Sequence, residues 1–249
     1  MKPNVVCATR VVRAAHTHPA VIEAAAAVLR KMSPRSRITV GESGGMGIST
    51  RLFFHYAGYT GMARRAGVTL SDLNEERQVR VRLSRAKWHK TILVAKSLYE
   101  SDFRMWMPKL KFHNGCKITN AVKLNIGILT HKERMLYHND RLNEKIVDLL
   151  EAGYPQLIIS DAVEIAHGQE FAPYAHHLGA LLIANEPLAA DMVGARILGF
   201  EPREVEHLVE ASEGGYGSLD FSDIEVSGDI SMEELAEKVG SVKDFVSAT

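Results

Sequence analysis

Residues 106–127 read WMPKLKFHNGCKITNAVKLNIG, and the pattern in this stretch decides how the rest of the chain is interpreted. A mostly apolar run at 103–107 comes first and predicts a β-strand. In an extended segment, side chains two positions apart point to the same side, so Lys109, Lys111 and His113 form one row. Two ammonium groups on one side repel unless a negative group lies between them, which predicts an anion-binding site. The alternative is a solvated basic edge whose lysines discourage pairing with other strands.

Outside this stretch, predicted strands and helices alternate. Strands are expected at 37–40, 78–83, 91–95, 157–160, 180–184 and 224–226, and helices at 20–32, 142–151, 187–198 and 232–239. This order is typical of an α/β protein with a mainly parallel central sheet and helices on both faces. We expect a single α/β domain over residues 1–249, and a small excursion at 77–99 is left open.

The composition is that of an ordinary globular protein and limits the classes of partner. Hydrophobic residues make up 46% of the chain, charged residues make up 24%, and 30 basic residues balance 30 acidic ones. A net charge of zero gives no argument for nucleic acid or for an anionic membrane, and the aromatic residues form no stacking platform among basic ones. We therefore expect neither nucleic acid nor a membrane as a partner.

The two cysteines and the N-terminal sequence bear on location. Cys7 and Cys116 are too few for a disulfide scaffold or for a four-thiolate cluster within one chain. The first residues lack the apolar core of a signal peptide, and the chain has no run of about 18 apolar residues that could cross a bilayer. These features predict a cytoplasmic protein.

Two aspartates are candidates for chemistry. Asp161 closes a predicted buried strand, and Asp191 lies inside the predicted helix at 187–198. Ligands of open α/β sheets bind beyond the carboxyl ends of strands, where a carboxylate can bind metal, orient a lysine or act as a base. The alternative for each is a cap or a salt bridge. The glycine-rich loop at 41–47 suits an anion but lacks the spacing of a P-loop, so an ordinary tight turn is the simpler interpretation.

Histidine is frequent, with 11 residues in the chain, but its spacing indicates no metal centre. No HExxH motif and no facial-triad spacing occurs, so we assign no metal ligands. Two histidines remain as candidates for general acid/base chemistry because imidazole titrates near neutral pH: His18, which precedes Pro19, and His113. Most of the others are expected on the surface.

Several short motifs together resemble one family of bacterial and archaeal proteins, the domain of unknown function 362. The residues that carry the resemblance are Lys2-Pro3-Asn4, His18-Pro19, Pro108-Lys109-Leu110-Lys111-Phe112-His113, Lys123-Leu124-Asn125-Ile126-Gly127, Asp161-Ala162, Glu186-Pro187-Leu188-Ala189-Ala190-Asp191 and Arg196-Ile197-Leu198-Gly199. They extend over nearly the whole chain. The resemblance implies a shared polar site but no settled reaction, and it adds Asn4 and Asn125 to the candidate residues.

Two departures from the family pattern affect what the resemblance implies. Many relatives carry a ferredoxin-like segment with cysteine-rich cluster motifs, which this chain lacks, so any iron–sulfur role would belong to a partner. The lysine and asparagine that the family places together are separated here by Leu124. The frequent ferredoxin fusion indicates redox chemistry by association rather than by mechanism.

The functional interpretation is an enzyme that acts on a small anionic substrate in a reductive or electron-coupled step. Catalysis is assigned to His113, His18 and Asp161, and substrate binding to Lys109, Lys111, Lys123, Asn125, Lys2, Asn4 and Asp191. Two alternatives are a module that holds an anionic ligand or cofactor without turnover, and a docking partner for a ferredoxin-like electron carrier. The sequence names no cofactor.

The start of the chain leads to an expectation about assembly. In the family, a hydrophobic strand precedes the Lys2-Pro3-Asn4 element, so either the natural protein begins upstream or this member lacks that strand. Loss of a strand would leave unpaired backbone groups, so we expect homo-oligomers or exposure of Val5 to Ala8 at a sheet edge. Lys2 would be poorly anchored because chain termini fray.

Overall fold

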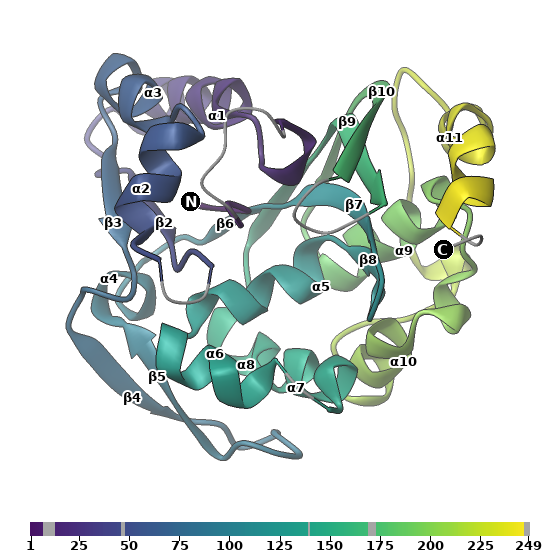
Figure 1. The fold of residues 1–249 in the computed structure, drawn as a ribbon. Helices are drawn as coiled ribbons and strands as arrows, with labels where there is room; N and C mark the ends of the chain where they lie inside the picture. The colour runs from purple at the N-terminus through teal and green to yellow at the C-terminus, as the bar shows by residue number, and fades with distance from the viewer. Residues whose placement is uncertain (7–12, 46–47, 139, 169–172, 247–249) are drawn as a thin grey trace.

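A six-stranded sheet, sheet A, organises the protein (Figure 1). The computed structural model describes residues 1–6, 13–45, 48–138, 140–168 and 173–246. Strand order in sheet A is β1-β6-β9-β7-β8, and β10 pairs with β9. The strands are β1 (Lys2–Pro3), β6 (Met105–Met107), β7 (Lys109–His113), β8 (Lys117–Thr119), β9 (Leu157–Gly168) and β10 (Pro173–Ala184).

Sheet A is mixed, which corrects the expectation of a mainly parallel sheet in part. The pairs β1–β6, β6–β9 and β7–β9 are parallel, whereas β7–β8 and β9–β10 are antiparallel. The antiparallel pairs arise because a short turn joins β7 to β8 and a short connection joins β9 to β10, and neither leaves room for a crossover. The α/β class is confirmed, and coverage of both sheet faces by helices stays a prediction.

Two smaller sheets flank sheet A. Strands β2 (Thr39–Glu42) and β3 (Thr69–Asp72) are parallel, while β4 (Gln78–Arg82) and β5 (Thr91–Ala95) form an antiparallel hairpin within the segment 77–99 that was singled out from the sequence. Backbone hydrogen bonds from Gly41 N to Met1 O (3.0 Å) and from Met1 N to Thr39 O (2.8 Å) join β2 to the start of the chain. Strand β1 therefore lies between β6 and β2.

The position of β1 corrects the expectations about the start of the chain. Val5 is only 1% exposed and packs in the core around α1 to α3, so exposure of this residue at a sheet edge is wrong. Cys7 and Ala8 lie outside the described residues. Lys2 is buried and held by neighbours on both sides, so the expectation of a frayed and poorly anchored Lys2 is also wrong.

The helices agree with the apolar spacing of the sequence over most of their length. Helix α1 begins at Pro19, as predicted, because the His18 side chain accepts the Ala20 N–H and the proline ring needs no hydrogen bond there. The α-helices are α1 (Pro19–Met32), α2 (Thr50–Tyr56), α3 (Tyr59–Ala66), α4 (Lys96–Tyr99), α5 (Ala121–Leu124), α6 (His131–Tyr137), α7 (Leu142–Asp148), α8 (Leu150–Gly153), α9 (Pro187–Ile197), α10 (Glu206–Glu213) and α11 (Met232–Val246).

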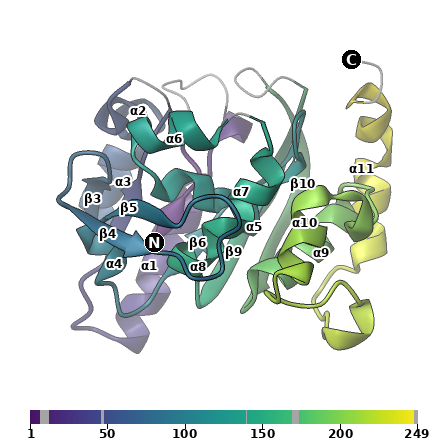
Figure 2. The same cartoon turned by 90° about the horizontal axis from the view of Figure 1, so that it is seen from below.

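Two groups of helices lie at opposite ends of the molecule, and helices α5 to α8 lie between them. Figure 2 shows α9, α10 and α11 beside β10 and α1, α2 and α3 at the opposite end. The first group shares a core with β7 to β10, and the second group covers β1, β2 and β6 with apolar side chains. Among the described helices, none is long and apolar enough to cross a membrane.

Several predicted strands differ from those observed. The strand expected at 37–40 is Thr39–Glu42, and the one expected at 180–184 already begins at Pro173. Strand β9 does not end at Asp161 but continues to Gly168, because the buried carboxylate of Asp161 is paired with Lys109 on the neighbouring strand. The predicted strand at 224–226 does not form, and these residues follow a short 3₁₀ turn at Phe221–Asp223. Its apolar residues were too few to distinguish a strand from a loop.

Candidate functional site

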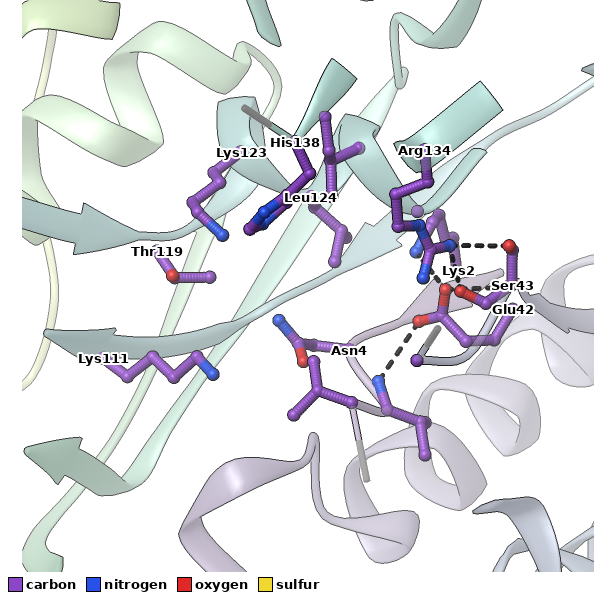
Figure 3. Close-up of a pocket in the computed structure, with 15 residues that line it drawn as sticks. Lys2, Asn4, Glu42, Ser43, Lys111, Thr119, Lys123, Leu124, Arg134 and His138 are labelled. Carbon is purple, nitrogen blue, oxygen red and sulfur yellow. Dashed lines mark hydrogen bonds and ion pairs between the residues drawn. The ribbon is translucent and has the colours of Figure 1, made fainter. Parts of the chain in front are cut away.

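A cavity of about 100 Å³ lies where β1, β2 and β8 end and meet α5 and α6 (Figure 3). Its cationic lining side chains are Lys2, Lys111, Lys123 and Arg134. Strands β1 and β2 present their carboxyl ends here. At this point the consecutive strands β6 and β7 change neighbours, because β6 pairs in parallel with β1 and β7 pairs antiparallel with β8. This is the position where α/β sheets commonly bind ligands.

Lys2 and Glu42 form a buried ion pair on one wall of the cavity. Lys2 Nζ lies 2.8 Å from Glu42 Oε1 and also donates to the Pro3 carbonyl at 3.2 Å. The Glu42 carboxylate accepts two further bonds, from Ser43 N at 2.8 Å and from Val5 N at 3.1 Å. Burial lowers the pKa of Lys2 and raises the pKa of Glu42, while their mutual attraction opposes both shifts. The contacts occupy both groups, so this wall is built mainly for structure.

Hydrogen bonds from Arg134 connect helix α6 to the loop after β2. Its guanidinium donates to the carbonyls of Ser43 and Gly44 and, at 2.6 Å, to Ser43 Oγ. Ser43 Oγ in turn donates to the Leu129 carbonyl at 2.6 Å. The hydrogen-bond partners of Arg134 are neutral, whereas the nearby carboxylates of Glu42 and Asp72 partly compensate its charge and oppose the lowering of its pKa by burial.

The other end of the cavity carries Lys111, Lys123, Asn4 and Thr119. Figure 3 shows the ends of the two lysines and the Asn4 amide pointing into one space. Asn4 is 5% exposed and Thr119 is 2% exposed, and within the described part of the chain neither Asn4 Oδ1 nor Thr119 Oγ1 has a hydrogen-bond partner. Buried polar atoms without a partner are costly, which indicates that a ligand or water completes them.

Backbone contacts hold Asn4 in place beside the cavity. Its N–H donates to Thr17 Oγ1 at 2.9 Å, its carbonyl accepts the Thr17 N–H at 3.0 Å, and Thr17 Oγ1 donates to the Met107 carbonyl at 2.6 Å. These bonds fix the backbone, so the Asn4 side chain is directed at the cavity without any loss of chain entropy on binding.

Asp191 positions the short helix that carries Lys123. Its carboxylate accepts the N–H groups of Ala121 (2.7 Å) and Val122 (3.1 Å) at the start of α5. Burial raises the pKa of Asp191 to about 8, and the neighbouring His207, with Nε2 3.9 Å from Asp191 Oδ2, has a pKa lowered by burial to about 3. The carboxylate does not line the cavity, so Asp191 acts on Lys123 through α5.

Asn125 and Gly127 support the same region. Asn125 Oδ1 accepts the Trp106 indole N–H at 3.2 Å, and its amide donates to the Val122 carbonyl at 3.1 Å. A Cβ on Gly127 would lie 2.5 Å from Lys2 Nζ and 2.7 Å from Glu42 Oε1, so only glycine lets the chain pass this ion pair. In the Lys-Leu-Asn-Ile-Gly element, Lys123 lines the cavity, Asn125 makes buried hydrogen bonds that hold α5, and Gly127 lets the backbone pass close to the Lys2–Glu42 pair.

Lys109, Asp161 and His18 form a separate cluster outside the cavity lining. Lys109 Nζ lies 3.1 Å from Asp161 Oδ2, which also accepts the His18 N–H at 2.7 Å. The His18 imidazole caps helix α1 through Ala20 N at 3.2 Å. Lys109 and Lys111, which were expected in one row, have different surroundings, and the β7–β9 register shifts between them.

His113 lies at the turn between β7 and β8. Its Nδ1 accepts the N–H groups of Gly115 (3.1 Å) and Cys116 (3.0 Å). These bonds shape the turn, and His113 is not among the residues that line the cavity. The structure therefore brings together Lys2, Asn4, Lys111 and Lys123 of the predicted residues, and it places His18, His113, Lys109, Asn125, Asp161 and Asp191 around them. The acid/base roles of His18 and His113 stay predictions.

Five polar lining residues were not singled out from the sequence: Glu42, Ser43, Thr119, Arg134 and His138. Glu42 and Ser43 belong to the glycine-rich loop whose signal was weak, and Arg134 and His138 share helix α6 and its end. No spacing rule relates α6 to β2, because only the folded chain brings them together. Among the described residues, no group of three or more His, Cys, Asp and Glu side chains is placed to hold a metal ion.

The family model Domain of unknown function (DUF362) matches residues 1–196. The chain therefore belongs to this family, as its motifs indicated, and the match includes every lining residue of the cavity. It ends within α9, so α10 and α11 lie beyond the matched region. No curated protein matches the chain.

Proposed function

We propose that the protein is an enzyme that binds a small anionic substrate in this cavity. The observation that carries the proposal is the charge of the described lining residues, which include Lys2, Lys111, Lys123 and Arg134 together with Glu42, the partner of Lys2. A low-dielectric pocket with excess positive charge favours a carboxylate or phosphate. Among the described residues, the Thr119 hydroxyl has no hydrogen-bond partner and can donate to an anionic oxygen, whereas Asn4 Oδ1 can accept from a hydroxyl of the ligand or from water.

His138 supports turnover rather than binding alone. This imidazole lines the cavity near Lys123 (Figure 3), and imidazole exchanges protons near neutral pH. Lysine ammonium groups beside it can stabilise negative charge that develops on a carbonyl or phosphoryl oxygen. His138 therefore replaces His18 and His113 as the best-placed acid/base group, and a module that binds without turnover is the alternative.

A reductive step remains part of the proposal, with an external electron carrier as partner. The basic side chains of Arg80 and Arg82 are exposed on strand β4, a surface suited to an acidic carrier such as a ferredoxin-like protein. A cytoplasmic location and a homo-oligomer are likewise proposed. Binding of the carrier that weakens steeply with salt, and is lost in the variant R80E/R82E, supports this docking surface.

The test of the anion site is a titration of the protein with inorganic phosphate, acetate and oxalate by calorimetry at constant ionic strength. The Lys111→Ala variant is expected to lose about tenfold or more in affinity, because a charge-assisted contact contributes about 1.5–3 kcal/mol. Lys31→Ala is the matched control, since Lys31 lies exposed in the last turn of α1. Equal effects in the two variants would contradict a localised site.

The test of turnover separates binding from catalysis. Mass spectrometry of the purified protein identifies small molecules that it retains, and any retained anion is then assayed for conversion. His138→Gln is expected to lower kcat far more than KM, because it removes proton transfer and keeps a polar side chain. A change confined to KM would favour the binding module.

A further inference from the structure

Two buried hydrogen-bond donors of the cavity lining have no partner among the residues that the structure describes. Lys123 is 5% exposed, and no hydrogen bond or ion pair engages its ammonium group within that part of the chain. The Thr119 hydroxyl, on a residue that is 2% exposed, is likewise without a partner there. Both groups can donate to a negatively charged oxygen, so they suit the head group of an anion.

Asn4 presents a buried acceptor to the same space. Its Oδ1 has no hydrogen-bond partner in the described part of the chain, and Figure 3 shows the Asn4 amide and the end of Lys123 directed into one space. Two hydrogen bonds to Thr17 fix the Asn4 backbone beside the cavity. A buried acceptor without a partner is costly, so a ligand that fills this space is expected to bring a donor to Asn4.

An anionic head group by itself cannot satisfy Asn4 Oδ1. A carboxylate or a fully ionised phosphate has only acceptor oxygens, and such an oxygen beside Asn4 Oδ1 would bring two sets of lone pairs together. The carboxylate of the described lining, Glu42, is already engaged by Lys2 and by two backbone N–H groups, so it requires no donor from a ligand. The requirement for a ligand donor therefore falls on Asn4.

From these three groups we propose that the substrate is a hydroxylated anion, namely a small carboxylate or phosphate ester that carries a hydroxyl group close to its charged end. The inference rests on the proposed anion site and specifies its substrate class. The charged group contacts Lys123 and the Thr119 hydroxyl, and the hydroxyl of the ligand donates to Asn4 Oδ1. The same amide carries N–H donors, so it can also donate to the head group beside that hydroxyl.

The experiment compares probes of nearly equal size in which a methyl group replaces the hydroxyl: glycolate with propionate, and 2-hydroxyethyl phosphate with propyl phosphate. Calorimetric titrations at one pH and constant ionic strength give the affinity ratio of each pair. The hydroxylated probe is expected to bind about fivefold or more tightly, because it satisfies a buried acceptor that the methyl group leaves unpaired. A site for carboxylates shows this preference in the first pair, and a site for phosphates shows it in the second.

Two variants assign the preference to its residue. Asn4→Ala removes the acceptor and is expected to bring the affinity ratio close to one. Thr119→Val keeps the shape of the side chain without its hydroxyl, so it is expected to weaken both members of a pair and to keep their ratio. Asn185→Ala is the matched control, since Asn185 lies exposed between β10 and α9. Melting curves check that each variant folds, and Asn4→Leu serves if the alanine variant does not.

The possible outcomes separate the two claims. Equal affinities within both pairs would overturn the hydroxylated substrate and leave the anion site standing, because water would then satisfy Asn4 as well as the ligand does. A preference that survives in Asn4→Ala would overturn it as well. Failure of all four probes to bind would overturn the anion site and this inference with it.

Discussion

Lys109 and Lys111 lie two residues apart on β7, yet they belong to two different environments. Lys109 is paired with Asp161 at 3.1 Å inside the sheet, and Asp161 also anchors the start of helix α1 through His18 N. Lys111 is equally buried, at 2% exposure, but its side chain lines the cavity. The β7–β9 register shifts between the two lysines, of which one pairs with a carboxylate of the sheet and the other lines the cavity.

This difference shows that burial alone does not identify a functional lysine. A buried ammonium group needs a compensating charge, and for Lys109 a carboxylate of the same sheet supplies it. At the cavity, Glu42 is engaged by Lys2, and Lys111, Lys123 and Arg134 are further cationic side chains of the described lining. The following predictions test or sharpen this contrast, from the largest expected effect to the smallest.

Removal of the Lys109 ammonium is expected to have the largest effect on stability. Lys109→Ala leaves Asp161 as a buried carboxylate without its cation, so the free energy of unfolding should fall by about 3–5 kcal/mol in urea denaturation. Asp161→Ala should lower the free energy of unfolding by a similar amount, because it leaves the Lys109 ammonium without its carboxylate and removes the acceptor of the His18 N–H. If Lys109→Ala lowered the free energy of unfolding by less than Lys111→Ala does, the proposed difference between the two lysines would be wrong.

Asp191 is expected to make stability depend on pH. Its pKa is about 8 in the folded protein and 3.8 as the ordinary value, so the folded state keeps a proton that the unfolded state releases. The stabilisation that the protonated Asp191 provides is present below about pH 4 and is lost as the pH rises through about 8. Over this range the free energy of unfolding of the wild type should fall by on the order of a few kcal/mol relative to that of Asp191→Asn.

Unfolding curves of the two proteins between pH 4 and 8 measure this difference. His207 titrates in the opposite sense, because its lowered pKa of about 3 favours folding as pH rises towards 6.5. It is present in both proteins, so its contribution largely cancels in the comparison. A difference that stays flat or grows in favour of the wild type would show that Asp191 is ionised in its buried site.

Gly127 tests the close packing around the Lys2–Glu42 pair. Gly127→Ala places a methyl group 2.5 Å from Lys2 Nζ, and overpacking of this kind costs about 1–3 kcal/mol. Gly240→Ala is the matched control, since nothing lies within 4 Å of its Cβ and alanine favours the helix α11. If thermal melts show equal behaviour for the two variants, the wall around Lys2 is looser than the distances indicate.

Lys111→Ala is expected to change stability least among these variants. Its side chain borders a cavity, where water can take the place of the removed atoms, so the free energy of unfolding should change by less than about 1.5 kcal/mol. The same variant should lose most of its anion affinity, as described above. A large loss of stability without a loss of binding would assign Lys111 to the structure and not to the site.

The candidate site could be predicted in part from residue types and strand ends. Lys111 was predicted from its spacing with Lys109 and His113 in an extended segment, and Lys123, Lys2 and Asn4 from the motifs of the family. Asp161 and Asp191 were correctly linked to lysines or caps as the alternative role, and both have structural contacts of this kind. Arg134 and His138 could not be assigned to the site from the sequence, because they reach the cavity only through the contact of α6 with the loop after β2.

The amino-acid sequence by itself determined the α/β class, the family and the approximate positions of helices α1, α7, α9 and α11, because apolar spacing, prolines and caps act over a few neighbouring residues. It also determined the strands at 91–95 and, within a residue, at 78–82. The tertiary structure decided that β9 runs through Asp161, that β1 is enclosed between β2 and β6, and which of the two lysines on β7 faces the cavity. These features depend on register and on partners distant in the chain, and the free energy of burying a charge is settled only when its partner is in place.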